Sequence, residues 1–351
     1  MLHPDATPSA AGSLTTPVLL LIFNRPSTTQ QVLEALRRAQ PARLYVAADG
    51  PRPDRPTDAA LCQETRQLVL NSIDWPCEVH TLFQPTNLNC GVGPATAISW
   101  FFRHEAEGII LEDDCVPTGS FFPFCQEMLA RYRHDTRIMH IGGNNFGAPN
   151  HVLRPEEPSY YFSSQVNSWG WATWRRAWQL YDFHLTDFER IRSSGSLSRA
   201  YSSGLEARYR LAKIAGVMRL SSPPHVWDYQ WHFAVAAHSG LCIVPATNLV
   251  GNIGFGAAAT HTHDAEDDFA AVPTQDLLFP LQHPLRVLRD HRRDQYQFRR
   301  FLLGRVQAIG RRWLRRLVPR LPTPSASPAS PALSASVPAH LSVSPANADV
   351  S

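Results

Sequence analysis

Short apolar runs alternate with helical patterns through the first third of the chain. Strand-like runs lie at 17–23, 44–48, 79–83 and 109–111, and the first of them has the length and composition of a buried strand. Apolar residues at helical spacing follow the first three runs, at 27–38, at 57–72 and from the glycine turn 89–93 to about 104. Ser27 followed by Gln30 has the form of a capping box. The alternation predicts a doubly wound, mostly parallel α/β sheet of Rossmann-like type, in which ligands bind at the carboxyl ends of the strands.

The regular alternation fades after residue 118. The remaining pattern predicts helices at 120–133, 205–218 and 228–238, and short strands at 138–141 and 160–162. We expect this irregular half, 119–285, to pack on the first half, 17–118, so that the two form one cleft within a single domain, 17–285.

The two ends of the chain differ in composition from this domain. Residues 1–16 predict a flexible N-terminus, and 322–351 are mostly Pro, Ser and Ala, the composition of a disordered tail. Between domain and tail, 286–321 alternates apolar and arginine residues at helical spacing. Such a basic amphipathic helix either lies on an anionic membrane surface or docks on the domain with its basic face in water, and the sequence leaves both open.

Composition narrows the class of protein. The 351 residues are 44% hydrophobic, enough for a substantial core, and a formal net charge of +3 gives no general affinity for nucleic acid. The six cysteines form no CxxC pair and no Cys/His zinc spacing, a pattern typical of free thiols in a reducing compartment. Residues 1–16 carry no basic and apolar leader, so we expect a cytoplasmic protein.

Three consecutive acids, Glu112, Asp113 and Asp114, follow the fourth apolar run. A strand that ends in acids points carboxylates out of a sheet edge. Adjacent carboxylates raise one another's pKa, so they stay ionised only beside a cation, an arginine or open water. A hard divalent ion that bridges to a phosphate meets this need, because Mg²⁺ and Mn²⁺ take oxygen ligands and often only one or two carboxylates. A solvated acidic turn is the alternative.

Several short motifs follow one another in a definite order. They are Phe23-Asn24-Arg25-Pro26, Ala48-Asp49-Gly50, Leu111-Glu112-Asp113-Asp114, Trp169-Gly170-Trp171, Trp227-Asp228, Gly254-Phe255-Gly256 and Thr260-His261. This ordered set, over about 17–263, resembles the GT-A-fold glycosyltransferases. The similarity is greatest to the inverting N-acetylglucosaminyltransferases of N-glycan synthesis and to bacterial proteins like them. It implies a nucleotide-sugar half at about 17–118 and an acceptor or catalytic half at about 119–285.

The resemblance assigns roles to the acids. It implies that Asp114 coordinates Mn²⁺ or Mg²⁺ against the donor diphosphate, while Glu112 and Asp113 contact sugar and ribose hydroxyls. It also implies that Asp49 meets the nucleoside. A bound metal would stabilise the negative charge that develops on the leaving nucleotide diphosphate.

Other motif residues take roles by the same likeness. Asn24 and Arg25 would lie near the nucleoside, although Arg25 as a structural arginine that satisfies loop carbonyls is an equal alternative. His261 resembles the family's histidine near the metal and diphosphate, and a neutral imidazole can ligate a metal or donate to a phosphate oxygen.

Asp228 is our candidate general base. It lies at the expected start of a helix, between Trp227 and Tyr229. An inverting transfer needs one base near the acceptor hydroxyl, on the face opposite the departing diphosphate, and the similar Trp-Asp of the family does this work. A capping aspartate with only a stability role is the alternative.

Tryptophans are concentrated at 167–178. Trp169 and Trp171 flank a glycine, and flat aromatic faces suit the CH faces of sugars, so we expect these two to contact the acceptor. Trp174 and Trp178 are four residues apart and are expected to form a buried helix face.

Together these features predict an inverting, metal-dependent glycosyltransferase of the hexosyl or N-acetylhexosaminyl kind. It would move sugar from a nucleotide-diphosphate sugar to a glycan or lipid-linked acceptor in bacterial surface polysaccharide synthesis, in the cytoplasm or on the inner face of the cytoplasmic membrane. A degenerate carbohydrate-binding protein of the same fold is one alternative. A sugar-phosphate nucleotidyltransferase is another, but it would want a glycine-rich loop with Arg or Lys after the first strand, and Asn24-Arg25-Pro26-Ser27 is not one.

Overall fold

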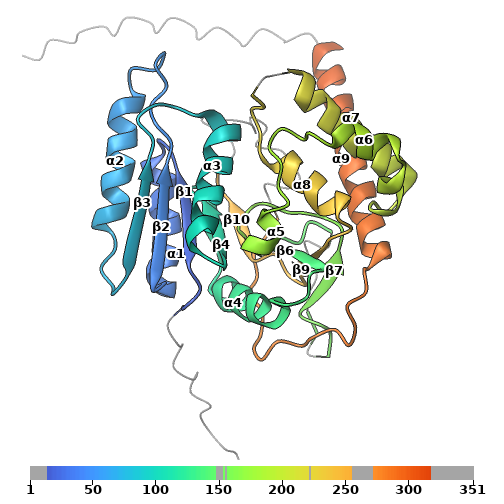
Figure 1. Cartoon of the computed structure of the whole chain (residues 1–351), viewed down its shortest axis with the longest axis horizontal. Coiled ribbons are helices and arrows are strands. Elements are labelled where there is room, and N and C mark those ends of the chain that lie inside the picture. Colours follow the sequence, from blue (N-terminus) through green and yellow to red (C-terminus); the bar gives the residue numbers. More distant parts are fainter. Residues whose placement is uncertain (1–13, 148–152, 155, 221–222, 255–271, 318–351) are drawn as a thin grey trace, which may run out of the picture. The chain divides into compact units, whose positions relative to one another are not determined.

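The computed structural model describes residues 14–147, 153–154, 156–220, 223–254 and 272–317 (Figure 1). The chain divides into two compact units, 1–305 and 306–351. The described part of the second unit is helical and belongs to the last helix.

An eight-stranded sheet of order β3-β2-β1-β4-β8-β6-β9-β7 forms the centre. Its strands are β1 (Val18–Ile22), β2 (Arg43–Ala48), β3 (Glu78–Phe83), β4 (Glu107–Glu112), β6 (Ile138–Gly142), β7 (Tyr160–Ser163), β8 (Trp171–Trp174) and β9 (Leu241–Pro245). β3, β2, β1 and β4 are parallel, and β9 is parallel to β6. β8 runs antiparallel between β4 and β6, and β7 is an antiparallel edge strand. The predicted mostly parallel α/β sheet is confirmed.

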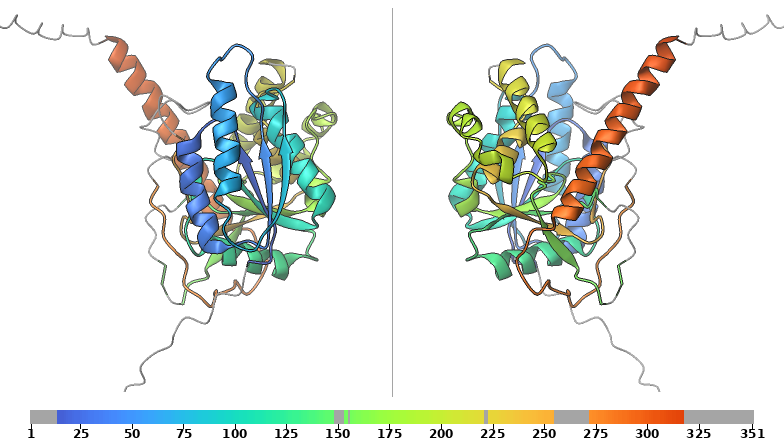
Figure 2. Two further views of the ribbon diagram at one scale, coloured as in Figure 1. Left: turned by 90° about the vertical axis from the view of Figure 1, so that its left-hand side faces the viewer. Right: turned by 90° about the vertical axis from the view of Figure 1, so that its right-hand side faces the viewer.

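Helices cover both faces of this sheet because its central strands are apolar on both sides. Along β1, Val18, Leu20 and Ile22 join the cluster that includes α1 (Pro26–Ala39), α2 (Asp58–Asn71) and α4 (Phe121–Tyr132). The alternate residues Leu19 and Leu21 join the cluster of α3 (Asn89–His104), α5 (Arg175–Trp178) and α8 (Asp228–Ala237). The left view of Figure 2 shows α1 and α2 on one side of the sheet and α3 on the other.

A third apolar cluster packs the remaining short helices beside α8. Its members come from α6 (Phe188–Ser193), the 3₁₀ turn η1 (Ser196–Arg199), α7 (Gly204–Leu220) and Phe233 of α8. A two-stranded antiparallel ribbon, β5 (Cys115–Pro117) with β10 (Val250–Asn252), closes the turn that follows β4.

The first part of α9 (His291–Leu317) docks on this body. Phe298 is buried, and the Phe298 and Phe301 rings lie 6.0 and 5.6 Å from the Tyr209 ring of α7. Asp294 is buried at the start of the same helix and accepts hydrogen bonds from Ser163 and Ser164. Up to Arg305, therefore, the docking alternative describes the basic helix. Among the described helices, none combines the length and apolar character needed to cross a bilayer.

Two local predictions were wrong. The first helix begins at Pro26, with Arg25 before it and no side-chain cap, so Ser27 and Gln30 form no capping box. Proline suits the first helical position because its φ is already helical and its missing N–H would have no partner there. Trp174 ends a strand and Trp178 ends α5, and they belong to different apolar clusters, so they share no helix face.

Candidate active site

The carboxyl ends of three neighbouring parallel strands bring the motif residues to one edge of the sheet. Ile22 pairs with Ala48, so the segments that follow β1 and β2 start side by side. Leu21 pairs with Glu112, the last residue of β4. Arg25, Asp49 and the acidic triplet therefore meet where a parallel sheet offers its binding edge.

Arg25 is the counter-ion of the acidic triplet. Its Nη1 lies 2.9 Å from Asp114 Oδ2, and its Nη2 donates a hydrogen bond to Asp113 Oδ1. The Phe23 N–H donates to the other oxygen of Asp113, at 3.2 Å. Both aspartates are buried, whereas Glu112 is partly exposed. Arg25 thus binds carboxylates. From the sequence alone it is expected either near the nucleoside or on the carbonyl groups of a loop.

Burial and mutual repulsion leave the cluster short of positive charge. The pKa of Glu112 is raised to about 8, first by its withdrawal from water and then by the charges of Asp114 and Asp113. Burial also raises the pKa of Asp113 to about 6, although Arg25 opposes that shift. Burial would lower the pKa of Arg25, but the two aspartates outweigh it and raise that pKa. One arginine is insufficient for three carboxylates, so the cluster will take up a proton or a further cation at neutral pH.

Asp114 is also held by residues that are distant in the sequence, in and after β10. β10 pairs with β5 so that Asn252 lies opposite Cys115, and the Asn252 amide donates to Asp114 Oδ1 at 3.3 Å. The Ile253 N–H donates to the Asp114 carbonyl at 2.9 Å. A Cβ on Gly254 would lie 2.0 Å from Asp114 Oδ2, which explains the glycine there. Sequence reasoning missed Asn252; its place just before the Gly254 motif was the available signal.

Asp49 organises the turn that leads to α3. Its Oδ1 accepts the N–H groups of Gly50 and Leu88, both at 2.8 Å, and its Oδ2 accepts the Asn87 amide at 3.0 Å. Burial raises the pKa of Asp49, and the backbone N–H groups oppose this. The carboxylate faces Gly93, where a Cβ would lie 3.4 Å from Oδ2. Asp49 therefore fixes the loop at the edge of the site, and any nucleoside contact is additional.

Asn24 serves a neighbouring ion pair. Its amide donates to Asp58 Oδ1 at 2.8 Å, and the same carboxylate accepts from Arg52 at 2.6 and 3.0 Å. The contact ties the segment after β1 to the start of α2. The expected nucleoside contact of Asn24 stays a prediction.

Asp228 is the first residue of α8, and Trp227 rather than Asp228 is the cap residue. The segment before it packs against the start of α3, since a Cβ on Gly91 would lie 2.0 Å from the Pro224 carbonyl oxygen. The charge of Asp228 contributes to the raised pKa of Glu112. After burial, the carboxylates of Glu112, Asp49 and Asp228 together raise the pKa of Cys90. Charges from β4, from the end of β2 and from α8 therefore all act on the start of α3.

The two tryptophans assigned to the acceptor separate. Trp171 is 0% exposed and stacks between His140, at 5.2 Å, and Trp227, at 5.7 Å. The assignment of Trp171 to the acceptor site is wrong, because a side chain inside the core offers no face to a solute. Its stacking contact instead holds Trp227, the residue before Asp228. Trp169 is partly buried and meets the edge of Phe146 at 5.0 Å, so it stays a candidate.

The donor set fits a divalent ion that arrives with a diphosphate. His261 lies outside the described residues, and within them no three His, Cys, Asp or Glu side chains form a metal cluster. The partly exposed Glu112 carboxylate and Asp114 Oδ2 are hard oxygen donors at the binding edge. Mg²⁺ is commonly held by one or two carboxylates together with substrate phosphates and water, which two such groups satisfy.

Comparison with known proteins gives distant structural likenesses, among them the three below. No family model and no characterised sequence matches the chain. Among solved structures, the inositol-1-phosphate CTP transferase from T. maritima is 8% identical with a TM-score of 0.37, over 69% of this chain and 90% of that chain. HddC from Yersinia pseudotuberculosis is 9% identical with a TM-score of 0.27, over 46% and 78%. UDP-glucose pyrophosphorylase complexed with UDP-glucose is 10% identical with a TM-score of 0.25, over 42% and 62%. Likeness at this level carries no functional argument.

Proposed function

We propose that this protein is an inverting, metal-dependent glycosyltransferase that transfers a hexosyl or N-acetylhexosaminyl group from a nucleotide-diphosphate sugar to a glycan or lipid-linked acceptor. The observation that supports this is that the acidic triplet and Asp49 follow neighbouring strands at one sheet edge, while the segment before Asp228 packs against the start of α3. The acid cluster carries more negative charge than Arg25 can offset, so it is suited to a diphosphate that arrives with a bound cation. Asp228 is a separate carboxylate that is available as the base.

On the donor side, Glu112 and Asp114 would hold Mg²⁺ or Mn²⁺. When bound, the ion stabilises the charge of the leaving diphosphate as a Lewis acid. Arg25 now binds Asp114 Oδ2, so it would have to release that oxygen, and its freed guanidinium suits a phosphate oxygen. Asn252 keeps Asp114 in place during this exchange because it holds the other oxygen, Oδ1.

On the acceptor side, Asp228 would take the proton of the attacking hydroxyl. The acceptor oxygen then bonds to the anomeric carbon as the bond from that carbon to the diphosphate oxygen breaks, and the electron pair leaves with the diphosphate. Trp227 precedes this base and is itself fixed: it stacks on Trp171, and its carbonyl accepts the Tyr181 hydroxyl at 3.1 Å. A fixed base matters because proton transfer depends on hydrogen-bond geometry.

One observation favours a second candidate. Arg25 contacts two of the three acids and offsets one of their charges, which lowers the need for a metal and would suit a carbohydrate-binding protein that has lost turnover. The nucleotidyltransferase alternative gains no such support, because β1 leads through Phe23-Asn24-Arg25 directly into α1 at Pro26 without a glycine-rich loop.

The test is a screen of nucleotide-diphosphate sugars for slow hydrolysis by the full chain, with Mn²⁺, Mg²⁺ or EDTA, measured as nucleotide diphosphate released. We expect release that requires the metal and that Asp114→Asn abolishes. Asp54→Asn, at an exposed acid outside the cluster, is the matched control and should leave release unchanged. Binding of a glycan without nucleotide or metal, and no release from any donor, would support the binding protein instead.

A further inference from the structure

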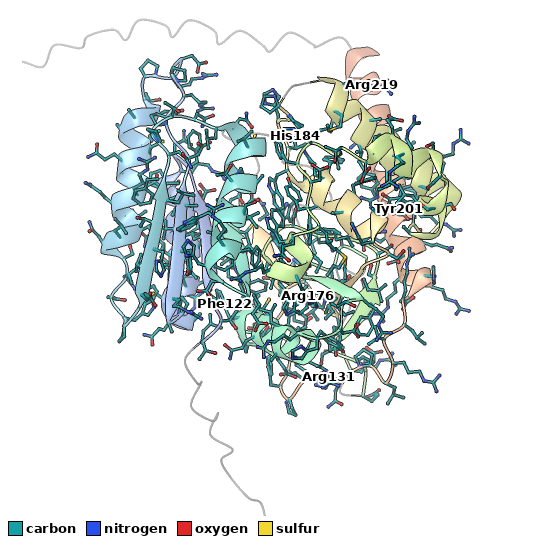
Figure 3. All side chains as sticks on the ribbon, viewed as in Figure 1. Phe122, Arg131, Arg176, His184, Tyr201 and Arg219 are labelled. Carbon is teal, nitrogen blue, oxygen red and sulfur yellow. The ribbon has the colours of Figure 1, made fainter. Side chains whose placement is uncertain are left out.

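A cleft on α6 and α7 is separate from the acidic site. Its volume is about 420 Å³, and none of the candidate active-site residues lines it. The lining residues are Arg192 of α6 and Arg208, Leu211, Ala212, Ala215, Gly216 and Arg219 of α7. Figure 3 labels Arg219 near the end of α7.

The floor of the cleft is aliphatic and open. Leu211, Ala212 and Ala215 supply it, and a Cβ built on Gly216 would meet nothing within 4 Å. Leu205, about one turn before Arg208 on the same face of α7, is 63% exposed. Among the described residues no aromatic side chain lines the cleft, and a sugar ring prefers a flat aromatic partner, so the floor suits a hydrocarbon chain better than a glycan.

Arginines form the rim of this floor. Arg192 is exposed and paired with Glu189 at 2.5 Å. Arg208 and Arg219 are exposed too, and in the described part of the chain neither has an acidic partner within ion-pair distance. They are eleven residues apart on one helix, which corresponds to about 16 Å. Each end of the aliphatic cleft floor thus carries an arginine without an acidic partner among the described residues.

We propose that this cleft binds the phosphate and the adjoining hydrocarbon of a lipid-linked acceptor. The proposal rests on the proposed glycosyltransferase function. Guanidinium groups recognise phosphate oxygens by paired hydrogen bonds, and the aliphatic floor removes the first methylene groups from water. The concave shape favours one chain lifted from the membrane over the flat surface of a bilayer.

The test uses decyl phosphate below its micelle-forming concentration as the probe, with decanol and inorganic phosphate as its separate halves. Binding to the full chain is measured by calorimetry. We expect decyl phosphate to bind more tightly than either half, and the variant of the arginine beside the phosphate, Arg208→Gln or Arg219→Gln, to weaken it about five- to tenfold. Ala212→Trp, which fills the floor, should weaken decyl phosphate but not inorganic phosphate. Arg38→Gln, at an exposed arginine of α1, is the matched control.

Each outcome decides the proposal. Equal affinities in wild type and both arginine variants, or no binding by the wild type, would overturn it. Loss of binding to phosphatidylglycerol vesicles in these variants, with decyl phosphate binding unchanged, would make the cleft a bilayer contact and also overturn it. Donor hydrolysis is measured in parallel. Donor hydrolysis without probe binding would contradict only the assignment of the cleft. Probe binding without donor hydrolysis would contradict the proposed glycosyltransferase function and, with it, the acceptor role of the cleft.

Discussion

Replacing Arg25 by methionine isolates the electrostatic balance of the acidic cluster. The arginine side chain is 23% exposed and its partners Asp113 and Asp114 are 4% and 11% exposed, so the substitution leaves buried carboxylates without a cation. Removing one partner of a buried pair costs about 3–5 kcal/mol of unfolding free energy. The exposed pair of Arg37 with Asp74, at 3.2 Å, provides the control, because Arg37→Met should cost less than about 1 kcal/mol.

The loss should depend on pH with a definite sign. The folded pKa of Asp113 is about 6, above an unfolded value of about 3.9, so the folded state binds more protons between these values and stability from this group falls as pH rises. Arg25 holds the pKa values of Asp113 and Glu112 down, so its removal raises both further. At pH 5 both carboxyls of the variant are largely protonated and the loss is small. At pH 8 the loss is larger, because the Asp113 carboxyl must then ionise without a cation beside it.

Urea unfolding followed by tryptophan fluorescence at pH 5, 7 and 8 measures this difference. We expect the gap between wild type and Arg25→Met to widen steadily across that range, and Asp113→Asn to recover part of the loss when added to the variant. A gap below about 1 kcal/mol at pH 8, in the range of an exposed pair, would refute the assignment of Arg25 as a buried counter-ion. So would a gap that does not change with pH.

Three further substitutions test the site. Asp114→Asn should abolish nucleotide-sugar turnover and the metal-dependent part of nucleotide binding by calorimetry; near-normal activity contradicts its role as metal ligand. Asp228→Asn should keep donor affinity within about twofold while transfer falls at least about 100-fold in a coupled nucleotide-release assay, and a loss of donor binding instead would contradict the base assignment. Gly254→Ala places a Cβ where Asp114 Oδ2 lies, so it should cost about 1–3 kcal/mol in urea unfolding and weaken metal-dependent nucleotide binding; an unchanged midpoint would show that the carboxylate moves freely.

The parallel half of the fold could be predicted because its signals are local. The predicted strands at 44–48 and 79–83 match β2 and β3 to within a residue. β2 is buried along most of its length and needs a nearly unbroken apolar sequence, whereas the edge strand β3 is only partly buried and mixes apolar with polar residues. The order of the later strands could not be predicted. β8 lies between β4 and β6 through the pairs of Ile110 and Gly142 with Trp171, and such long-range pairing leaves no periodic trace in the sequence.

The candidate site divides in the same way. A run of acids after a strand predicts carboxylates at the sheet edge, and Glu112 does end β4. The Trp169-Gly170-Trp171 motif was misleading because Gly170 adopts a φ of 65°, and the turn there sends Trp171 into the core as the first residue of β8. A glycine between two tryptophans cannot show from sequence which ring stays near the surface.

Arg25 explains how the domain keeps three adjacent acids without a ligand. Buried carboxylates destabilise a fold unless a cation or a proton accompanies them, and the strand register places Arg25 where it contacts two of the three and offsets one of their charges. The same pairing makes the cluster selective. A lone divalent ion must displace the guanidinium from Asp114, whereas a diphosphate that carries the ion offers that guanidinium new acceptors. The metal ion should therefore bind weakly alone and tightly together with a nucleotide diphosphate. This difference in affinity arises from Arg25 and not from the number of acids.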